Sequence, residues 1–127
     1  MFSMLLVSEM AAANWDDVYY CQMTNLLQIT LAGEKTNYKL EKFQFKLDQT
    51  KNAMAFGSTG YFKDVVLELV KGDNWPRLET WYANNKYSKG YFAEGNFLFT
   101  SNGHSGVVAA SADCDKFYRP NYSNQTP

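Results

Sequence analysis

The sequence predicts a small all-β domain in which an antiparallel meander closes into a β-barrel of about 8–9 strands. Two observations predict this fold. Short runs rich in Val, Ile, Tyr, Phe, Trp and Thr recur roughly every ten residues, and Gly, Asn and Asp residues separate them. A two-sheet β-sandwich is the alternative, because it has the same strand pattern. The barrel is favoured because closure removes exposed strand edges.

The predicted strands follow one another along the body of the chain. They cover residues 17–23, 25–32, 38–47, 53–57, 61–70, 78–83, 87–93, 96–101 and 106–114. The segments between them carry turn residues, as in AGEKTN (32–37), EGN (94–96) and SNGHSG (101–106). Gly and Asn tolerate the positive φ that tight turns require, so we expect successive strands to be antiparallel neighbours.

Alternation assigns the faces of two of these strands. In KFQFKL (42–47), Phe43, Phe45 and Leu47 share one side and polar residues share the other. This pattern is typical of a half-buried strand with one wet face. The run 61–70 carries apolar residues on both sides, which predicts a strand that is covered on both sides.

Length and composition indicate one domain. The chain has 127 residues, and domains cluster at about 100–150 residues. We expect a single all-β domain over residues 14–117 and a flexible polar tail over 118–127. Residues 1–13, MFSMLLVSEMAAA, resemble a signal peptide or its remnant, although no Lys or Arg begins the segment and Glu9 interrupts it. The alternative is a short apolar first strand or a frayed terminus.

The charge and hydropathy of the chain argue against two kinds of partner. Twelve basic residues face 13 acidic ones, for a net charge of -1. There is no basic excess to neutralise a phosphate backbone, so we do not expect nucleic acid as a partner. No apolar run approaches the ~20 residues of a membrane-spanning helix, so we expect no transmembrane segment.

The two cysteines predict a covalent link between the ends of the domain. Cys21 and Cys114 lie on the first and last predicted strands of the body, each on an apolar side. In a closed meander those strands are neighbours, and adjacent strands supply the short Cα–Cα distance that a disulfide needs. We therefore predict a Cys21–Cys114 disulfide and a periplasmic or secreted protein. The alternative is two free buried thiols in a cytoplasmic protein.

Residues for catalysis and metal binding are sparse. Two cysteines and a single histidine, His104 in a turn, cannot make a four-ligand zinc site without carboxylates, so we expect no metal and no cofactor. His104 is also a poor general base for Ser105, because neighbours in sequence rarely face each other. Spacing selects no carboxylate pair for glycoside chemistry from Asp64, Glu68, Glu79 and Glu94. We expect no catalytic residues, and hence no enzyme.

Aromatic residues crowd the stretch from 75 to 92. They are Trp75, Trp81, Tyr82, Tyr87, Tyr91 and Phe92. On a sheet they could form a stacking platform for sugars or bases, line a cavity for an apolar ligand, or pack the core.

One segment, GSTGYFKDVVLELVKGDNWPRLE (57–79), resembles the middle of the periplasmic inhibitors of C-type lysozymes. Those proteins are small β-barrels with a Ser-Gly-rich loop ending in Tyr, then a strand and a Lys-Gly loop, and a disulfide joins their two ends. The resemblance implies that Ser58, Tyr61 and Lys71 bind a partner enzyme, with Ser58 and Lys71 as the inhibitory residues. The segment departs from the family at Trp75 and Pro76, where small residues are preferred. A long part of the chain also follows residue 79, where the family's chain is nearly finished.

We therefore expect an exported protein with a non-catalytic binding or structural role. Its partner would be an unknown protein, or a small apolar or sugar ligand. The alternative is a periplasmic inhibitor of C-type lysozymes that inserts the loops around Ser58 and Lys71 into the enzyme's cleft.

Overall fold

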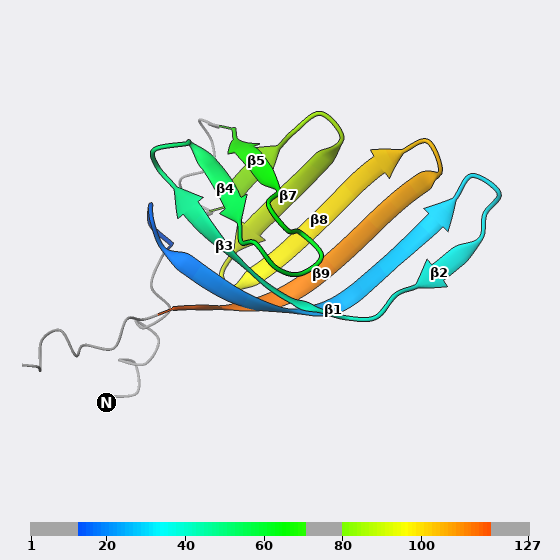
Figure 1. The fold of residues 1–127 in the computed structure, drawn as a ribbon, viewed down its shortest axis with the longest axis horizontal. Coiled ribbons are helices and arrows are strands. Elements are labelled where there is room, and N and C mark those ends of the chain that lie inside the picture. The colour runs from blue at the N-terminus through cyan, green and yellow to red at the C-terminus, as the bar shows by residue number, and fades with distance from the viewer. Residues whose placement is uncertain (1–12, 71–79, 118–127) are drawn as a thin grey trace, which may run out of the picture.

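In the computed structural model, nine strands make one antiparallel sheet (Figure 1). The structure describes residues 13–70 and 80–117, and these two ranges contain no helix. The strands are β1 (Val18–Thr30), β2 (Lys35–Asn37), β3 (Lys42–Asp48), β4 (Ala53–Phe56), β5 (Val66–Leu69), β6 (Trp81–Asn84), β7 (Ser88–Ala93), β8 (Asn96–Gly103) and β9 (Gly106–Lys116). Most of the signal-peptide-like segment (1–12) and the C-terminal tail (118–127) lie outside the described residues, as does Lys71.

β1 closes the sheet into a barrel, because it pairs with β3 along one edge and with β9 along the other. From β3 to β9, each strand pairs with the next one in the chain, so the barrel is a meander of eight antiparallel strands. β2 stays outside the ring and pairs with the far end of β1. Figure 1 shows that the β1–β2 and β8–β9 hairpins extend past the short strands β4 and β5. The predicted barrel is confirmed, and the chain does not adopt the alternative sandwich.

A bulge lets β1 run without a break through a segment that we predicted as two strands, 17–23 and 25–32. The register with β9 passes from Met23–Ala112 to Asn25–Ser111, so Thr24 is the extra residue. A bulge shifts the alternation by one position, and Leu26 therefore follows Met23 as the next buried residue. β2 was also missed, since its three residues belong to the segment predicted as a turn.

Aromatic rings fill the barrel. Eight of them are less than one-tenth exposed: Tyr19, Phe43, Phe45, Phe56, Phe62, Phe92, Phe97 and Phe99. Their contacting ring centroids lie between 4.5 and 5.9 Å apart. Phe43, Phe45 and Leu47 face inward as predicted. The rings occupy the space that an internal cavity for an apolar ligand would need.

The strand predicted over 61–70 is shorter in the structure, because its first half belongs to a loop that closes one end of the barrel. Only Val66–Leu69 is strand, and residues 57–65 make a loop across one end of the barrel. Phe62 in this loop is 1% exposed, and its ring packs edge-on against Phe43 and Phe99. Burying such a ring stabilises the fold by about 1.5–3 kcal/mol, which favours the loop over a longer strand. The expectation that this strand is covered on both sides is wrong, since Val66 faces outward and is 45% exposed.

A disulfide joins β1 to β9 at the seam where the barrel closes. Cys21 and Cys114 are directly opposite in the register, and their Cα atoms are 4.0 Å apart. Directly opposed residues of an antiparallel pair point to the same face, and here both side chains face the core. The predicted Cys21–Cys114 bond is confirmed, and the alternative of free thiols is wrong.

Candidate functional site

The loop between β4 and β5 carries Ser58 and Tyr61, two of the three residues that the resemblance indicates. Hydrogen bonds close the base of this loop: the Gly57 N–H donates to the Gln44 carbonyl at 3.0 Å, and the Asp64 N–H donates to the Gly57 carbonyl at 2.8 Å. Buried Phe62 anchors its C-terminal half. Ser58 is exposed on the outer part of the loop, where a partner could reach its hydroxyl group.

Tyr61 lies at the border between the β4–β5 loop and the connection from β2 to β3. Tyr61 is 43% exposed, and its ring packs edge-on against Phe62, with centroids 5.0 Å apart. Burial raises the pKa of Tyr61 above the ordinary value of 10.0, and the nearby Tyr38 and Glu41 raise it further. Tyr38 and Leu40 of the connection are also exposed, at 45% and 44%. Apolar surface therefore continues from the loop onto the connection.

Lys71, the third residue that the resemblance indicates, lies outside the described residues. Val70, the last described residue before it, donates its N–H to the Tyr82 carbonyl at 2.9 Å. Val70 and the β4–β5 loop are at opposite ends of β5, a strand of four residues that spans about 13 Å.

The aromatic stretch from 75 to 92 divides between the two faces of the barrel by strand parity. Phe92 is buried, and Trp81 packs against the core. Tyr82 and Tyr91 face outward and stack on each other, with ring centroids 4.7 Å apart and planes at 20°. Trp75 lies outside the described residues. Core packing therefore accounts for Phe92 and Trp81, whereas Tyr82 and Tyr91 stand on the outer face.

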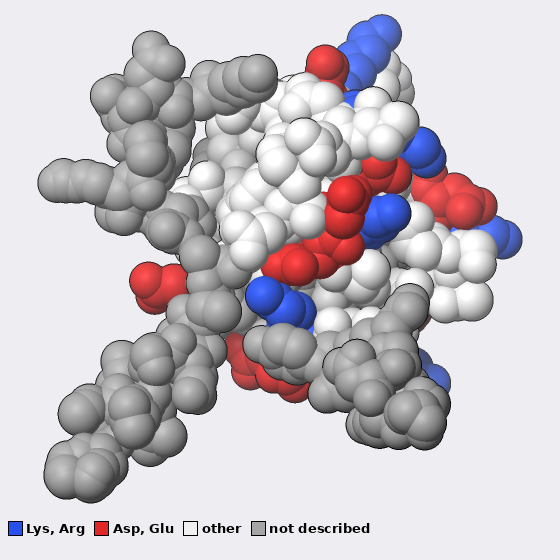
Figure 2. Space-filling model, turned by 90° about the vertical axis from the view of Figure 1, so that its left-hand side faces the viewer, with Lys and Arg blue, Asp and Glu red and all other residues white. Residues whose placement is uncertain are grey.

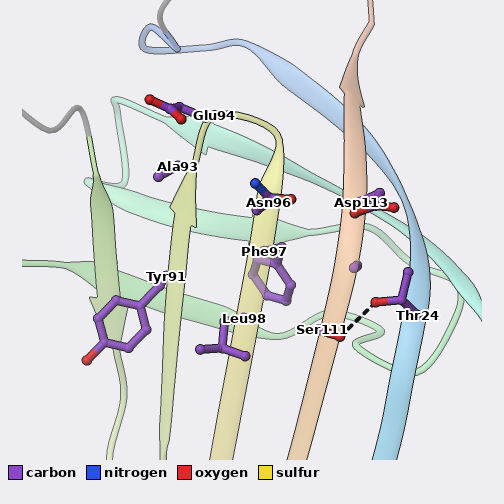
Figure 3. Close-up of a pocket in the computed structure, with 10 residues that line it drawn as sticks. Thr24, Tyr91, Ala93, Glu94, Asn96, Phe97, Leu98, Ser111 and Asp113 are labelled. Carbon is purple, nitrogen blue, oxygen red and sulfur yellow. Dashed lines mark hydrogen bonds between the residues drawn. The ribbon is translucent and has the colours of Figure 1, made fainter.

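A groove crosses the outer face of β7, β8 and β9 and ends at the bulge of β1 (Figure 3). Its volume is about 460 Å³, within the range of roughly 300–1,000 Å³ for small-ligand sites. Tyr91, Leu98 and Ser111 lie directly opposite one another on the three strands and form its first row. Tyr91 is 37% exposed and Leu98 is 47% exposed, so this row presents apolar surface to solvent.

The bulge of β1 builds one wall of the groove. The Thr24 and Ser111 hydroxyl oxygens are 2.7 Å apart, and the Asn25 side-chain amide donates to the same Ser111 oxygen at 2.8 Å. Thr24 and Asn25 are both exposed, since the extra residue of a bulge puts two neighbouring side chains on one face. Figure 3 shows the Thr24–Ser111 hydrogen bond at the edge of the groove.

The second row of the groove is polar. Ala93, Asn96 and Asp113 lie opposite one another, one step along the strands from Tyr91, Leu98 and Ser111. Glu94 stands above this row in Figure 3, on the turn from β7 to β8. The side chains of Glu94, Asn96 and Asp113 are exposed, and within residues 13–70 and 80–117 they make no hydrogen bond or ion pair.

The turn that carries Glu94 is held tightly against β9. Glu94 and Gly95 have φ values of 53° and 81°, the pair of positive angles that a two-residue hairpin turn of type I′ requires. The Cys114 N–H donates to the Gly95 carbonyl at 2.8 Å. Asn, Asp or Gly usually fills the first position of such a turn, whereas this chain keeps a longer carboxylate there.

Sequence reasoning missed most of the groove. Glu94 is one of four carboxylates among which sequence spacing selects no pair for glycoside chemistry. Tyr91 is one of six aromatic residues that the sequence assigns either to the core or to a binding surface. Leu98, Ser111 and Asp113 were not singled out. The outward side of each strand follows from the sequence pattern, but the residues that meet across strands depend on the register. The Glu94–Gly95 turn sets the register of β7 with β8, the 104–105 turn sets that of β8 with β9, and the bulge at Thr24 shifts that of β9 with β1.

Charged side chains of both signs share the described surface (Figure 2). Figure 2 shows acidic and basic side chains interspersed on one end of the barrel. Among the described residues, no three His, Cys, Asp or Glu side chains are grouped so that they could hold a metal ion. The same part of the chain contains no helix that is long and apolar enough to cross a membrane.

Comparison with known proteins gives no match to a family model, to a curated protein or to a solved structure.

Proposed function

We propose that this chain is an exported, non-catalytic binding protein that holds its ligand in the outer groove of β7, β8 and β9. The observation that carries the proposal is the composition of that groove. Exposed Tyr91 and Leu98 lie beside three polar side chains that no other described residue engages. Ligand sites combine apolar surface with a few polar groups in this way.

The rigidity of the groove supports a binding role. Its side chains stand mainly on paired strands, and sites built on such elements hold their geometry better than sites on loops. The Cys114 N–H fixes the turn at one end of the groove, and the disulfide ties Cys114 to β1. A preorganised site loses less entropy when it binds. Export is supported by the same disulfide, because such bonds persist in oxidising compartments.

The test is a binding panel read by NMR chemical-shift mapping. The panel holds neutral oligosaccharides, Lys- and Arg-rich peptides and fatty acids. We expect at least one probe to shift the amide signals of β7, β8 and β9, and Leu98→Asp should abolish that binding. Val66→Asp is the matched control, since Val66 is also outward-facing and almost equally exposed, at 45%. A panel that shifts only the β4–β5 loop or nothing at all would reject the groove.

A second candidate function, inhibition of a C-type lysozyme, is favoured by one specific arrangement. Ser58 and Tyr61 are exposed on an anchored loop of a closed barrel whose first and last strands share a disulfide. That combination is what the resemblance to the periplasmic inhibitors implies. Anchoring would favour insertion into a cleft, because little loop entropy is lost on binding.

Titration against a C-type lysozyme tests this second candidate separately. Inhibition should be lost in Lys71→Ala and weakened in Ser58→Ala, and it should be unaffected by Leu98→Asp in the groove. Lys63→Ala is a matched control, because Lys63 is exposed on the same loop. Absence of inhibition at micromolar concentrations would remove this function and leave the groove proposal intact.

A further inference from the structure

We infer that the ligand of the outer groove is a saccharide without acidic groups, an inference that rests on the proposed binding function. It assigns a chemical class to the ligand and a role to each row of the groove. Four features support it: the apolar row, the polar row, the sign of the charge and the pairing of the strands.

The apolar row matches one face of a pyranose ring. Such a ring presents carbon-bound hydrogens on its faces and hydroxyl groups around its rim, and the faces pack well on aromatic or aliphatic side chains. Tyr91 and Leu98 are directly opposite on neighbouring strands and are both exposed. Tyr82 stacks on Tyr91 and holds its ring in place. The first row is therefore a preformed apolar floor.

The polar row matches the rim of hydroxyl groups. A carboxylate accepts hydrogen bonds on two oxygens, and a side-chain amide both donates and accepts. Asn96 and Asp113 are directly opposite in the β8–β9 register, so together they can engage neighbouring hydroxyl groups. Glu94 adds a second carboxylate at the end of the same row (Figure 3). These three groups have no competing partner among the described residues.

The charge of the groove disfavours acidic ligands. Glu94 and Asp113 are both among the lining residues, and the described lining contains no Lys or Arg. Like charges repel, so a phosphate, sulfate or uronate group would be disfavoured here. A neutral sugar or an amino sugar meets no such repulsion.

Strand pairing separates a saccharide from a peptide. Extended peptides commonly add to a free sheet edge through main-chain hydrogen bonds. Along the groove, β8 and β9 are paired on both sides, and β7 is paired on both sides as far as Phe92. The groove must therefore recognise its ligand through side chains alone, as the two rows allow.

The test is calorimetric titration with the tetrasaccharides of glucose (cellotetraose and maltotetraose) and of N-acetylglucosamine. We expect at least one to bind, and we expect Tyr91→Ala and Asp113→Asn each to weaken that binding by about tenfold or more. Glu94→Asn should also weaken binding, although Asn suits the positive φ of the turn and should leave the fold as stable or more stable. The matched controls are Asp115→Asn, the next outward position of β9, and Tyr87→Ala, an exposed tyrosine outside the groove.

The outcomes distinguish this inference from the function on which it rests. If none of the three sugars binds at millimolar concentration while a basic peptide binds in the groove, the saccharide is wrong and the groove proposal stands. If a sulfated or uronic oligosaccharide binds more tightly than the neutral ones, the charge argument is overturned. If Asp115→Asn weakens sugar binding as much as Asp113→Asn, the assignment of the polar row is wrong.

Discussion

Reduction of the Cys21–Cys114 disulfide is the perturbation whose effect on stability can be worked out most directly from the structure. The bond closes a loop with a sequence separation of 93 residues, between the first and last strands of the barrel. The chain-entropy relation assigns a loop of this length about 4.7 kcal/mol at 25 °C, through the freedom that the unfolded chain regains on reduction. The net stability of a small domain is only about 5–15 kcal/mol. The loss should therefore remove a large share of it.

The folded barrel itself should survive reduction. Eleven residue pairs join β1 to β9, and only one of them is the cysteine pair. Urea unfolding of the oxidised and reduced protein at the same pH should give the predicted loss, with a larger m-value for the reduced chain because its unfolded state is more expanded. Cys21→Ala/Cys114→Ala should behave as the reduced protein does. A loss below about 2 kcal/mol, with an unchanged m-value, would refute the reasoning.

Two further predictions concern the β4–β5 loop. Phe62→Ala should lower the free energy of unfolding by about 3–5 kcal/mol in urea, because it leaves a cavity at the end of the aromatic core. Tyr61→Ala, at the exposed neighbouring position, should lower it much less. Equal losses would contradict the conclusion that Phe62 anchors the loop in the barrel. The raised pKa of Tyr61 means that the folded state holds the phenol proton more tightly than the unfolded state does. The protonated Tyr61 side chain therefore contributes its full share of stability below the ordinary tyrosine pKa, and this share is lost as the pH rises through the pKa of the folded state. The urea midpoint should therefore fall at alkaline pH more steeply in the native protein than in Tyr61→Phe, and identical pH profiles would show that Tyr61 titrates normally.

The two cysteines show what the alternation of residues along a strand can predict from the sequence alone. Their parity with neighbouring apolar residues was enough to predict that both side chains face inward. The meander was enough to predict that their strands meet. Both inferences depend on local pattern and on a topology with short connections, in which sequential strands are neighbours. They hold because nothing interrupts the alternation between Tyr19 and Met23, or between Ala110 and Cys114.

Parity fails where the chain departs from a regular ladder. Nothing in the sequence around Thr24 distinguishes a bulge from the break between two strands, because both shift the alternation by one residue. Phe62 is likewise in phase with a continuing strand from 61 to 70. The structure instead buries its ring in the end of the barrel. Tertiary burial decides between such local alternatives, and the local sequence pattern does not show which side chains will be buried.

The bulge at Thr24, which makes β1 look like two strands in the sequence, also shapes the proposed binding site. If β1 continued in regular alternation, only one of Thr24 and Asn25 would face outward. With the bulge, both side chains contact the Ser111 hydroxyl group, and Thr24 forms the wall at which the groove ends. At the polar row, the Glu94–Gly95 turn sets Ala93 opposite Asn96 and holds the Glu94 carboxylate beside them. Bulges and strained turns recur beside binding and catalytic sites because they redirect side chains that a regular sheet would separate. The irregularities are therefore the reason that both the fold boundaries and the groove escaped sequence-based prediction.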